Sequence, residues 1–355
     1  MLSGSPLMGS APVAVVIPSW NCMGDLRACI ESVRAQSGVD PELLVVDNGS
    51  GDGTVPFLER DGLPHIALSG NIGFSAAVNL GVSRTRSPFV TVLNADTVLE
   101  PDCLRRLVAT LTADPTLGGV QPRILQLERG VGRDRADPEA ILYSLGQALT
   151  RDGRGREQGA GRPQGTLTAE RREVFGVCGA ACVLRRELLA ALGGYDERYF
   201  AFCEDVDLNV RARVAGWRFY LEPEAVVWHV GNVAWSAGFR RPQAENARLV
   251  ARNRLATQIK FMPSRSIPRI ALVEAGALVR AAAARRLLPT LAGKLEALRW
   301  LPDLLRARRR LRDTGRLGRA REWLGVRTSR PRLDPPARPR PPSPPAGQGW
   351  RSSRS

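Results

Sequence analysis

The sequence predicts an α/β fold with a doubly wound, mostly parallel sheet, followed by a basic helical extension at the C-terminal end. Three observations support this prediction. Short apolar runs alternate with amphipathic stretches up to about residue 230, glycine-bearing polar loops follow several of these runs, and the last third is rich in Ala, Leu and Arg. A strand-helix-strand-helix rhythm indicates parallel strands joined by right-handed crossovers.

The first part of the chain alternates regularly between the two element types. Runs of mostly β-branched apolar residues predict buried strands. They lie at 13–19, 43–47, 65–68, 90–93 and 120–125. Apolar residues at helical spacing, with capping residues before them, predict helices. They lie at 25–36, 70–84 and 101–113.

The pattern is less regular after residue 125. Residues 126–172 lose periodicity and gain Gly and Arg, which predicts long irregular loops or an extended hairpin. Strands are predicted at 174–184, 219–221 and 225–228, and helices at 186–192, 204–216 and 245–261, with a loop at 195–202. Residues 267–325 are predicted to form further helices.

Charge divides the chain into two parts. Residues 1–237 carry 23 basic and 28 acidic residues, whereas residues 238–355 carry 28 basic and 7 acidic residues. A basic end on a mildly acidic body predicts a tethering surface for nucleic acid or anionic lipid.

The predicted organisation has four segments. They are a flexible N-terminus at 1–12, an α/β domain at 13–240, a basic amphipathic helical extension at 241–327 and a disordered Pro/Arg-rich tail at 328–355. Leucines of the extension recur near helical spacing opposite arginines, which suits helices lying in a lipid interface. A helical hairpin packed on the α/β domain is the alternative. The leucines are Leu287, Leu288, Leu291, Leu295, Leu298 and Leu301.

Cysteine usage and hydropathy bear on the compartment. The six cysteines form no Cys-x-x-Cys pair, which predicts reduced thiols and a cytosolic location. No secretory signal is visible near residue 1, and no uncharged apolar run reaches the roughly 18 residues of a membrane span.

Two polar residues follow the predicted strand at 90–93. Asn94 and Asp96 would lie at the carboxyl end of this strand, where open α/β sheets bind ligands. Two oxygen-bearing side chains at this spacing can turn toward one divalent cation. Asn and Asp are also common turn residues, and on this stretch alone a turn is the favoured interpretation.

Seven motifs, in order over roughly residues 13–230, resemble those of the inverting nucleotide-sugar glycosyltransferases of family 2. These enzymes have the GT-A fold, and the similarity is to the bacterial rhamnosyltransferase-like members. Each motif is weak alone, but seven in the family's order outweigh the turn interpretation. They are VVIPSWN (15–21), VVDNGSGDGT (45–54), GNIGFSAAVNLG (70–81), LNAD (93–96), GGYDERYF (193–200), FCEDVDL (202–208) and WH (228–229).

The resemblance implies a nucleotide-sugar site. Asp47 would accept the imide hydrogen of a uracil or thymine ring, although it could instead, or also, cap the turn that follows it. Gly73 could serve backbone geometry alone. The other residues implied to contact the donor are Pro18, Trp20, Asn21, Asn48, Ser50, Asn71, Asn79, Asn94 and Asp96.

The resemblance also implies a metal site and a base. Asp96 matches the second acid of the family's Asp-x-Asp motif and would hold Mg²⁺ or Mn²⁺, with Asn94 and His229 as further ligands. Asn94 departs from the usual carboxylate, and His229 could instead be a hydrogen-bonded structural residue. Asp205, or else Glu204, is implied to be the catalytic base, with helix capping as the alternative role.

The implied activity is transfer of a sugar to a hydroxyl of a polyprenyl diphosphate-linked cell-envelope glycan precursor. The first candidate is L-rhamnose from dTDP-rhamnose. The extension would hold the enzyme on an anionic membrane surface, as a peripheral protein on the inner face of the cell membrane. The alternatives are a UDP-sugar transferase (galactofuranosyl, galactosyl or N-acetylglucosaminyl), a basic nucleic-acid-binding protein, and an inactive scaffold with the same fold.

Overall fold

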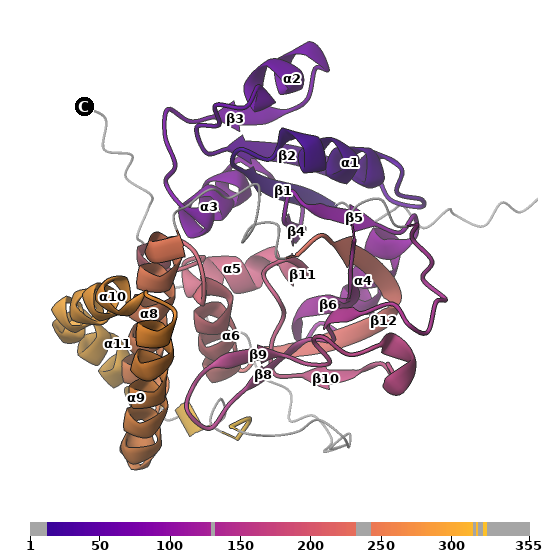
Figure 1. The fold of residues 1–355 in the computed structure, drawn as a ribbon. Helices are drawn as coiled ribbons and strands as arrows, with labels where there is room; N and C mark the ends of the chain where they lie inside the picture. Colours follow the sequence, from indigo (N-terminus) through magenta and orange to yellow (C-terminus); the bar gives the residue numbers. More distant parts are fainter. Residues whose placement is uncertain (1–12, 129–131, 232–242, 315–316, 319–321, 325–355) are drawn as a thin grey trace, which may run out of the picture.

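A ten-stranded mixed sheet with helices on both faces forms the centre of the protein (Figure 1). This computed structural model describes residues 13–128, 132–231, 243–314, 317–318 and 322–324. The strand order is β10-β12-β6-β11-β4-β1-β2-β3, with β5 beside β12 and β7 beside β6. A separate hairpin pairs β8 (Gln147–Leu149) with β9 (Gly155–Glu157). The strands of the main sheet are β1 (Val13–Ser19), β2 (Pro41–Asp47), β3 (His65–Ala67), β4 (Phe89–Leu93), β5 (Thr97–Leu99), β6 (Leu117–Gln126), β7 (Leu142–Ser144), β10 (Arg172–Val174), β11 (Ala181–Arg185) and β12 (Arg218–His229).

Helices cover both faces of the sheet and bury its central strands on both sides. In β1, Val15 and Ile17 pack into one core with α1, α2 and α4, whereas Val16 packs into a second core with α3, α5 and α6. The predicted doubly wound α/β fold is therefore confirmed. The helices of this part are α1 (Met23–Arg34), α2 (Thr54–Arg60), α3 (Phe74–Arg84), α4 (Cys103–Ala113), α5 (Arg186–Leu192) and α6 (Glu204–Ala215).

The structure corrects two local predictions and adds detail to a third. Residues 174–184 are not one strand, because β10 pairs with β12 while β11 lies between β4 and β6. The two short strands predicted around Pro223 are one strand, β12, whose register against β6 shifts between Glu222 and Val226. In the stretch 126–172, β7 joins the main sheet and β8 and β9 form a hairpin, so this stretch carries more structure than loops alone.

Other predictions concern thiols, membrane spans and the chain ends. All six cysteines are free, as expected, and four of them are buried. Across the described ranges, no helix combines the length and the apolar character that a bilayer-crossing segment needs. The predicted flexible N-terminus and the predicted disordered tail fall on residues that the structure does not describe.

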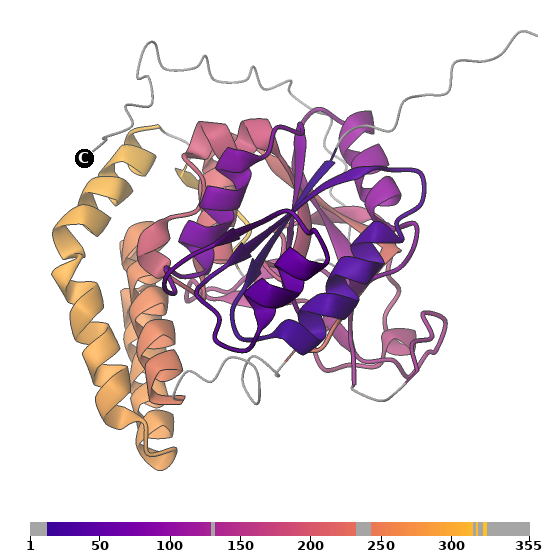
Figure 2. The same ribbon diagram turned by 90° about the horizontal axis from the view of Figure 1, so that it is seen from above.

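The C-terminal helices gather on one side of the α/β part (Figure 2). They are α8 (Gln243–Phe261), α9 (Ile267–Ala283), α10 (Leu287–Arg299) and α11 (Leu301–Asp313). A Cβ at Gly293 of α10 would lie 2.0 Å from the carbonyl oxygen of Arg248 in α8. Glycine therefore permits the close approach of these two helices.

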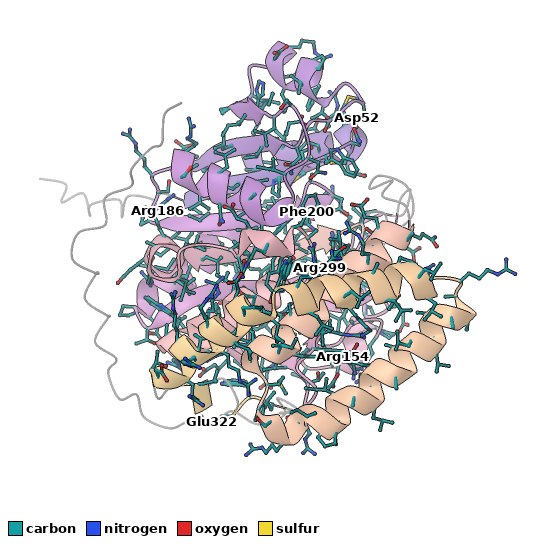
Figure 3. All side chains as sticks on the ribbon, turned by 90° about the vertical axis from the view of Figure 1, so that its left-hand side faces the viewer. Asp52, Arg154, Arg186, Phe200, Arg299 and Glu322 are labelled. Atoms are coloured by element: carbon teal, nitrogen blue, oxygen red, sulfur yellow. The ribbon has the colours of Figure 1, made fainter. Side chains whose placement is uncertain are left out.

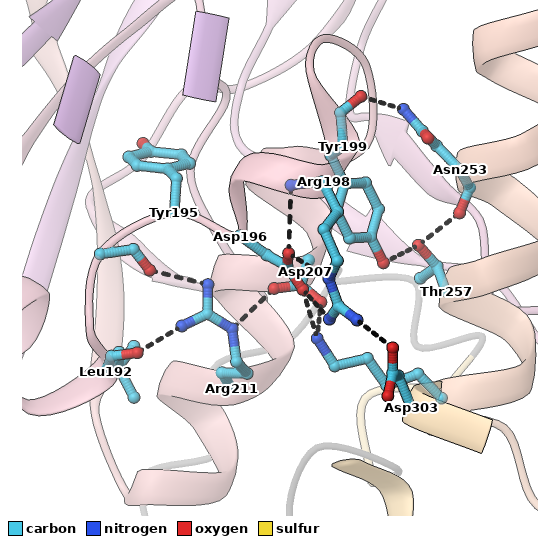
Figure 4. A network of polar contacts seen from close by, with 12 residues as sticks. Leu192, Tyr195, Asp196, Arg198, Tyr199, Asp207, Arg211, Asn253, Thr257 and Asp303 are labelled. Atoms are coloured by element: carbon cyan, nitrogen blue, oxygen red, sulfur yellow. Dashed lines mark hydrogen bonds and ion pairs between the residues drawn. The ribbon is translucent and has the colours of Figure 1, made fainter. Parts of the chain in front are cut away.

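Helix α8 is fastened to the α/β part by a buried polar network (Figure 4). Lys260 of α8 is 3% exposed and lies 2.5 Å from the fully buried Asp207 of α6 and 3.3 Å from Asp196. Arg211 also pairs with Asp207, at 2.6 Å, as its spacing on the helix suggests. Burial alone would raise the pKa of Asp207, but the charges of Lys260 and Arg211 outweigh burial and lower that pKa.

Replacing Lys260 tests how much this network stabilises the fold. Lys260→Met leaves Asp207 buried with one cation fewer, so we expect the free energy of unfolding to fall by about 3 kcal/mol. Chemical denaturation measures this change. The matched control is Arg306→Met, because Arg306 pairs with Asp303 at the surface, where the two side chains are 69% and 49% exposed, and its loss should cost about 1 kcal/mol or less. Equal losses in the two variants would contradict the interpretation.

Candidate functional site

Three parallel strands bring predicted site residues to one edge of the sheet. Strands β2, β1 and β4 run in the same direction, with Ser19 opposite Asp47 and Val16 opposite Val92. Asp47 ends β2, and Asn94 directly follows β4. Carboxyl ends of parallel strands meet at the same edge, so both residues lie where α/β sheets bind ligands.

Asp47 is fully buried, and only one of its carboxylate oxygens is occupied. Oδ2 accepts the backbone N–H groups of Gly49 and Ser50 at 3.1 and 2.9 Å, so Asp47 caps its turn as one interpretation expected. Oδ1 has no hydrogen-bond partner among the described residues. A buried acceptor of this kind requires a donor, and a bound ligand with an N–H group would supply one.

The loops after β1 and β2 are joined by side chains that the sequence assigned to the donor site. The backbone N–H of Asn21 donates to Ser50 Oγ at 2.9 Å, and Asn21 Oδ1 accepts the N–H of Gly51 at 2.8 Å. Pro18 pairs with Val46 inside the sheet, and Trp20 is half-buried beside Asn21. These contacts stabilise the loop on which the nucleotide prediction depends.

Gly73 begins α3 in a conformation that requires glycine. Its φ is +93°, and a Cβ there would lie 2.7 Å from the carbonyl oxygen of Phe200. Asn71 Oδ1 accepts the N–H of Gly73 at 2.9 Å, and Asn48 Oδ1 accepts the N–H of Ile72 at 3.4 Å. Backbone geometry therefore explains Gly73, whether or not it also contacts a donor.

Asn79 connects α3 to the segment that precedes α6. Its Nδ2 donates to the carbonyl of Tyr195 and to Glu197 Oε1, both at 2.9 Å, and its Oδ1 accepts the N–H of Tyr195 at 2.9 Å. These bonds anchor the 195–200 segment, and donor contact by Asn79 stays a prediction. In Figure 3, Phe200 lies where the N-terminal half meets the C-terminal helices.

The three predicted metal ligands lie in contact with one another. His229, at the end of β12, is 4% exposed, and its Nε2 lies 3.1 Å from Asp96 Oδ1 and 3.5 Å from Asn94 Nδ2. Tyr143 of β7 packs edge-on against the His229 ring. The buried Nδ1 of His229 has no hydrogen-bond partner in the described part of the chain. A carboxylate, an imidazole and an amide suit a divalent cation.

Asp205 and Glu204 begin α6 in a buried setting. Asp205 Oδ2 accepts the N–H of Gly179 at 3.1 Å and Gln147 Nε2 at 2.7 Å, and Oδ1 accepts the N–H of Val206 at 2.7 Å. Burial raises the pKa of Asp205 above its usual range. Burial, and then the charge of Asp205, raise the pKa of Glu204 to about 8.

A short peptide stretch before β11 joins the base candidates to the metal candidates. The N–H of Gly179 holds Asp205, and the carbonyl of the next residue, Ala180, accepts the N–H of Asn94 at 2.8 Å. Burial raises the pKa of Tyr143 above its usual range, and the charges of Asp96 and Asp205 are among the smaller contributions in the same direction. The start of α6 therefore lies beside the carboxyl end of β4.

Residues that the sequence interpretation missed complete this region. Glu157 on β9 accepts from Gln147 Nε2 at 3.0 Å and from the Ser144 hydroxyl, and burial followed by the Asp205 charge raises its pKa to about 7. Ligand atoms of Glu157, Cys178 and Asp205 lie within 4.8 Å of one another, close enough to share a cation. Because Gln147 already donates to both carboxylates, Asp96 and His229 are the better metal candidates.

Residues 14–193, about half of the chain, match the family model for glycosyl transferase family 2. The chain belongs to glycosyl transferase family 2. This family 2 protein also resembles a solved structure of GalNAc-T7 with UDP, GalNAc and Mn²⁺, with a TM-score of 0.53 and 15% identity over 71% of this chain and 48% of the other. That likeness shows the GT-A fold, as the sequence predicted.

Characterised relatives of this family 2 protein act in glycan assembly according to their names. N-acetylglucosaminyl-diphospho-decaprenol L-rhamnosyltransferase of Mycobacterium tuberculosis is 29% identical over 213 residues, 53% of this chain and 66% of that protein. Succinoglycan biosynthesis protein ExoO of Rhizobium meliloti is 35% identical over 107 residues, 29% of this chain and 31% of that protein. The matches thus span less than two thirds of either relative.

The raised pKa of Glu204 predicts how stability depends on pH. A carboxyl whose pKa rises on folding contributes stability at low pH and loses it as pH rises through the folded-state pKa, here about 8. The loss reaches about 1.4 kcal/mol per pH unit. We expect Glu204→Gln to match the wild type near pH 5 and to exceed it in unfolding free energy at pH 9. The exposed Glu187→Gln variant is the control, and parallel pH curves for wild type and Glu204→Gln would refute the assignment.

Proposed function

We propose that this protein is an inverting, metal-dependent glycosyltransferase that moves L-rhamnose from dTDP-rhamnose to a hydroxyl of a lipid-linked cell-envelope glycan precursor. The observation that carries the proposal is the buried carboxylate of Asp205, which the stretch Gly179–Ala180 links to Asn94 at the carboxyl end of β4. The name of the mycobacterial relative supports the choice of sugar and of a prenyl diphosphate-linked acceptor.

Asp205 is the proposed base of the reaction. In inverting transfer, a base removes the proton of the acceptor hydroxyl while that oxygen attacks the anomeric carbon on the face opposite the diphosphate. The raised pKa of Asp205 makes it a stronger base than an exposed carboxylate. Glu204 is the less suitable base, because its buried Oε2 has no hydrogen-bond partner among the described residues, whereas three N–H donors aim the Asp205 carboxylate.

Asp47 is the proposed contact for the nucleotide base. Its buried Oδ1 is an acceptor that the imide N–H of a thymine or uracil ring could satisfy. The loop around Asn21 and Ser50, together with Pro18, Trp20 and Asn48, would surround the nucleoside. The residues proposed to lie beside the sugar diphosphate are Asn71 and Gly73, just before α3, and Asn79, within α3.

Asp96, His229 and Asn94 are the proposed ligands of Mg²⁺ or Mn²⁺. When bound, the cation would neutralise charge on the departing diphosphate. Asp96 supplies an anionic oxygen and His229 a ring nitrogen, at 3.1 Å from each other. Asn94 presents its amide nitrogen toward His229, so its place as a ligand is the weakest of the three.

A different donor nucleotide is the second candidate. Oδ1 of Asp47 would accept the imide hydrogen of uracil as readily as that of thymine, so a UDP-activated galactofuranose, galactose or N-acetylglucosamine fits the same contact. A thermal-shift panel of dTDP, UDP and GDP sugars separates these donors. The basic residues at 238–355 would also attract nucleic acid, and a steep salt dependence of nucleic-acid binding would favour that alternative.

The helical extension is proposed to bind an anionic membrane surface, which would place the enzyme on the inner face of the cell membrane. Of the ten most exposed large apolar side chains in the described part of the protein, nine lie between Ile267 and Leu305. Leu288 is 78% exposed and Leu272 is 75% exposed. Arginines at 285–286, 306 and 308–310 accompany these side chains and suit anionic lipid headgroups. The proposal divides the chain into a catalytic domain at 13–240 and a membrane-binding extension at 241–327.

Substitution of two acids tests the proposed chemistry. In a transfer assay with dTDP-rhamnose and an N-acetylglucosaminyl diphosphate lipid, we expect Asp205→Asn to abolish turnover without changing dTDP affinity. Asp96→Ala should also abolish turnover, because the diphosphate charge is no longer neutralised. Both variants are compared with Asp137→Asn, an exposed acid outside the site. Normal turnover in Asp205→Asn would show that the base is a different residue.

Substitution of exposed leucines tests the membrane proposal. The double variant Leu272→Ser/Leu288→Ser should bind phosphatidylglycerol vesicles roughly tenfold or more weakly than the wild type, since two apolar side chains no longer enter the lipid. Thermal stability should stay the same because both side chains are exposed. Ile72→Ser, on an exposed apolar residue outside the extension, is the control. Unchanged vesicle binding in the double variant would exclude these helices as the contact.

A further inference from the structure

Gln147 on β8 bridges two buried carboxylates. Its side chain is 2% exposed, and its Nε2 donates to Asp205 Oδ2 at 2.7 Å and to Glu157 Oε1 at 3.0 Å. A primary amide nitrogen has two hydrogens, so each carboxylate receives one of them. Gln147 thus uses its full donor capacity on a pair of acids that would otherwise repel each other.

Asn209 of α6 fixes which way the Gln147 amide points. Asn209 Oδ1 accepts the backbone N–H of Val177 at 3.2 Å, and its Nδ2 donates to the carbonyl of Val177 at 2.8 Å and to Gln147 Oε1 at 2.9 Å. A backbone N–H can only donate, so the oxygen of Asn209 must face it. The amide nitrogen of Asn209 then faces the oxygen of Gln147, and the amide nitrogen of Gln147 faces the acids.

The backbone leaves room for this arrangement. A Cβ at position 176 would lie 2.2 Å from Asn209 Cγ, so Gly176 allows the amide to sit against the peptide chain. The backbone N–H of Gln147 donates to the carbonyl of Gly176 at 2.9 Å. Both amides are therefore held by the same peptide stretch and cannot rotate without losing hydrogen bonds.

The surroundings of Asp205 oppose its ionised form. Burial raises its pKa, and the N–H groups of Gly179, Val206 and Gln147 act in the opposite direction. Most of the titratable groups that face Asp205 are carboxylic acids, or are thiols and phenols that carry no charge when protonated. Two arginines lie near members of this set, Arg254 near Cys203 and Arg211 near Tyr195. The acids, thiols and phenols are Glu204, Glu157, Cys178, Cys182, Cys203, Tyr143 and Tyr195.

We propose that Gln147 is a positioning residue for the transfer reaction, which holds the Asp205 carboxylate ionised and correctly aimed, and that Asn209 keeps Gln147 in the orientation that does so. This inference rests on the proposed role of Asp205 as the base. Gln147 itself touches Asp205 and Glu157 and acts through the former. No role was predicted from sequence for the stretch 126–172, and this proposal assigns it one.

Removing the amide gives the first test. With dTDP-rhamnose and an N-acetylglucosaminyl diphosphate lipid as probes, Gln147→Leu should lower kcat at pH 7 by roughly tenfold to hundredfold, the effect of one lost hydrogen bond to a charged group. The acid limb of the kcat/KM profile should move to higher pH, and turnover should partly recover at pH 9. The affinity for dTDP should not change.

Asn209→Asp gives a second variant that touches neither carboxylate. Its new oxygen offers an acceptor where Gln147 Oε1 needs a donor, so the Gln147 amide should turn and present its oxygen to Asp205. The pH profile should then move in the same direction as in Gln147→Leu. The matched control is Gln36→Leu, which removes another buried glutamine that makes three hydrogen bonds near α1 and α4, away from Asp205.

A measurement without substrate separates this inference from the proposed function. The acids beside Gln147 have raised pKa values, to about 7 for Glu157, so their stabilising contribution is present at low pH and is lost as pH rises through these values. Removing Gln147 raises these pKa values further, so the stability deficit of Gln147→Leu should grow between pH 5 and pH 9. The deficit of Gln36→Leu should stay constant.

The outcomes are distinct. Inactive Asp205→Asn with a wild-type pH profile in Gln147→Leu would overturn the positioning role and leave the proposed function intact. Normal activity in Asp205→Asn would overturn the proposed role of Asp205 as the base, on which this inference rests. The stability measurement is judged separately from activity. A stability deficit of Gln147→Leu that does not change with pH would overturn the claim that Gln147 stabilises the ionised acids.

Discussion

The hydrogen bond from the Gly179 peptide to Asp205 joins two parts of the chain that are far apart in sequence. The neighbouring Ala180 carbonyl accepts the N–H of Asn94, so one short stretch before β11 fixes the start of α6 against the end of β4. Both bonds use backbone groups at the centre of a sheet. The separation between the proposed base and the proposed metal ligands is therefore set by the pairing of β4 with β11, which is far stiffer than a surface loop.

This arrangement includes a strained segment that the C-terminal helices stabilise. Phe200, Phe202 and Cys203 have φ values of 64°, 71° and 63°, a conformation that costs on the order of 1 kcal/mol at each non-glycine residue. Nδ2 of Asn253 in α8 lies within 2.8 Å of the carbonyl oxygens of Tyr199, Ala201 and Phe202. Helix α8 thus holds the residues that lead directly into Glu204 and Asp205, so the extension and the candidate site are parts of one structural unit.

The sequence predicted the strands that contain long continuous apolar runs and missed several strands of only three residues. Strands β2 and β4 contain continuous apolar runs, so their ends, and with them Asp47 and Asn94, could be located from the sequence. Strands β8 and β9 have three residues each and no alternation, so nothing in the pattern predicted that Gln147 and Glu157 would meet Asp205. The interruption of 174–184 arises because Gly176 and Gly179 lie against Asn209 and Asp205 across the fold, contacts that local periodicity does not contain.

Helix α10 of the extension buries small side chains and exposes large apolar ones. Helix α10 packs on α8 through Gly293 and Ala297, while Leu288 and Leu295 on its other side are 78% and 60% exposed. A hairpin stabilised by its own core would bury the leucines, because they remove more apolar surface from water than glycine or alanine. Exposed leucines beside arginines suit the proposed contact with an apolar surface that has anionic groups at its boundary. Since α8 also holds the segment that leads into Asp205, such a surface would fix the orientation of the candidate site as well as its position.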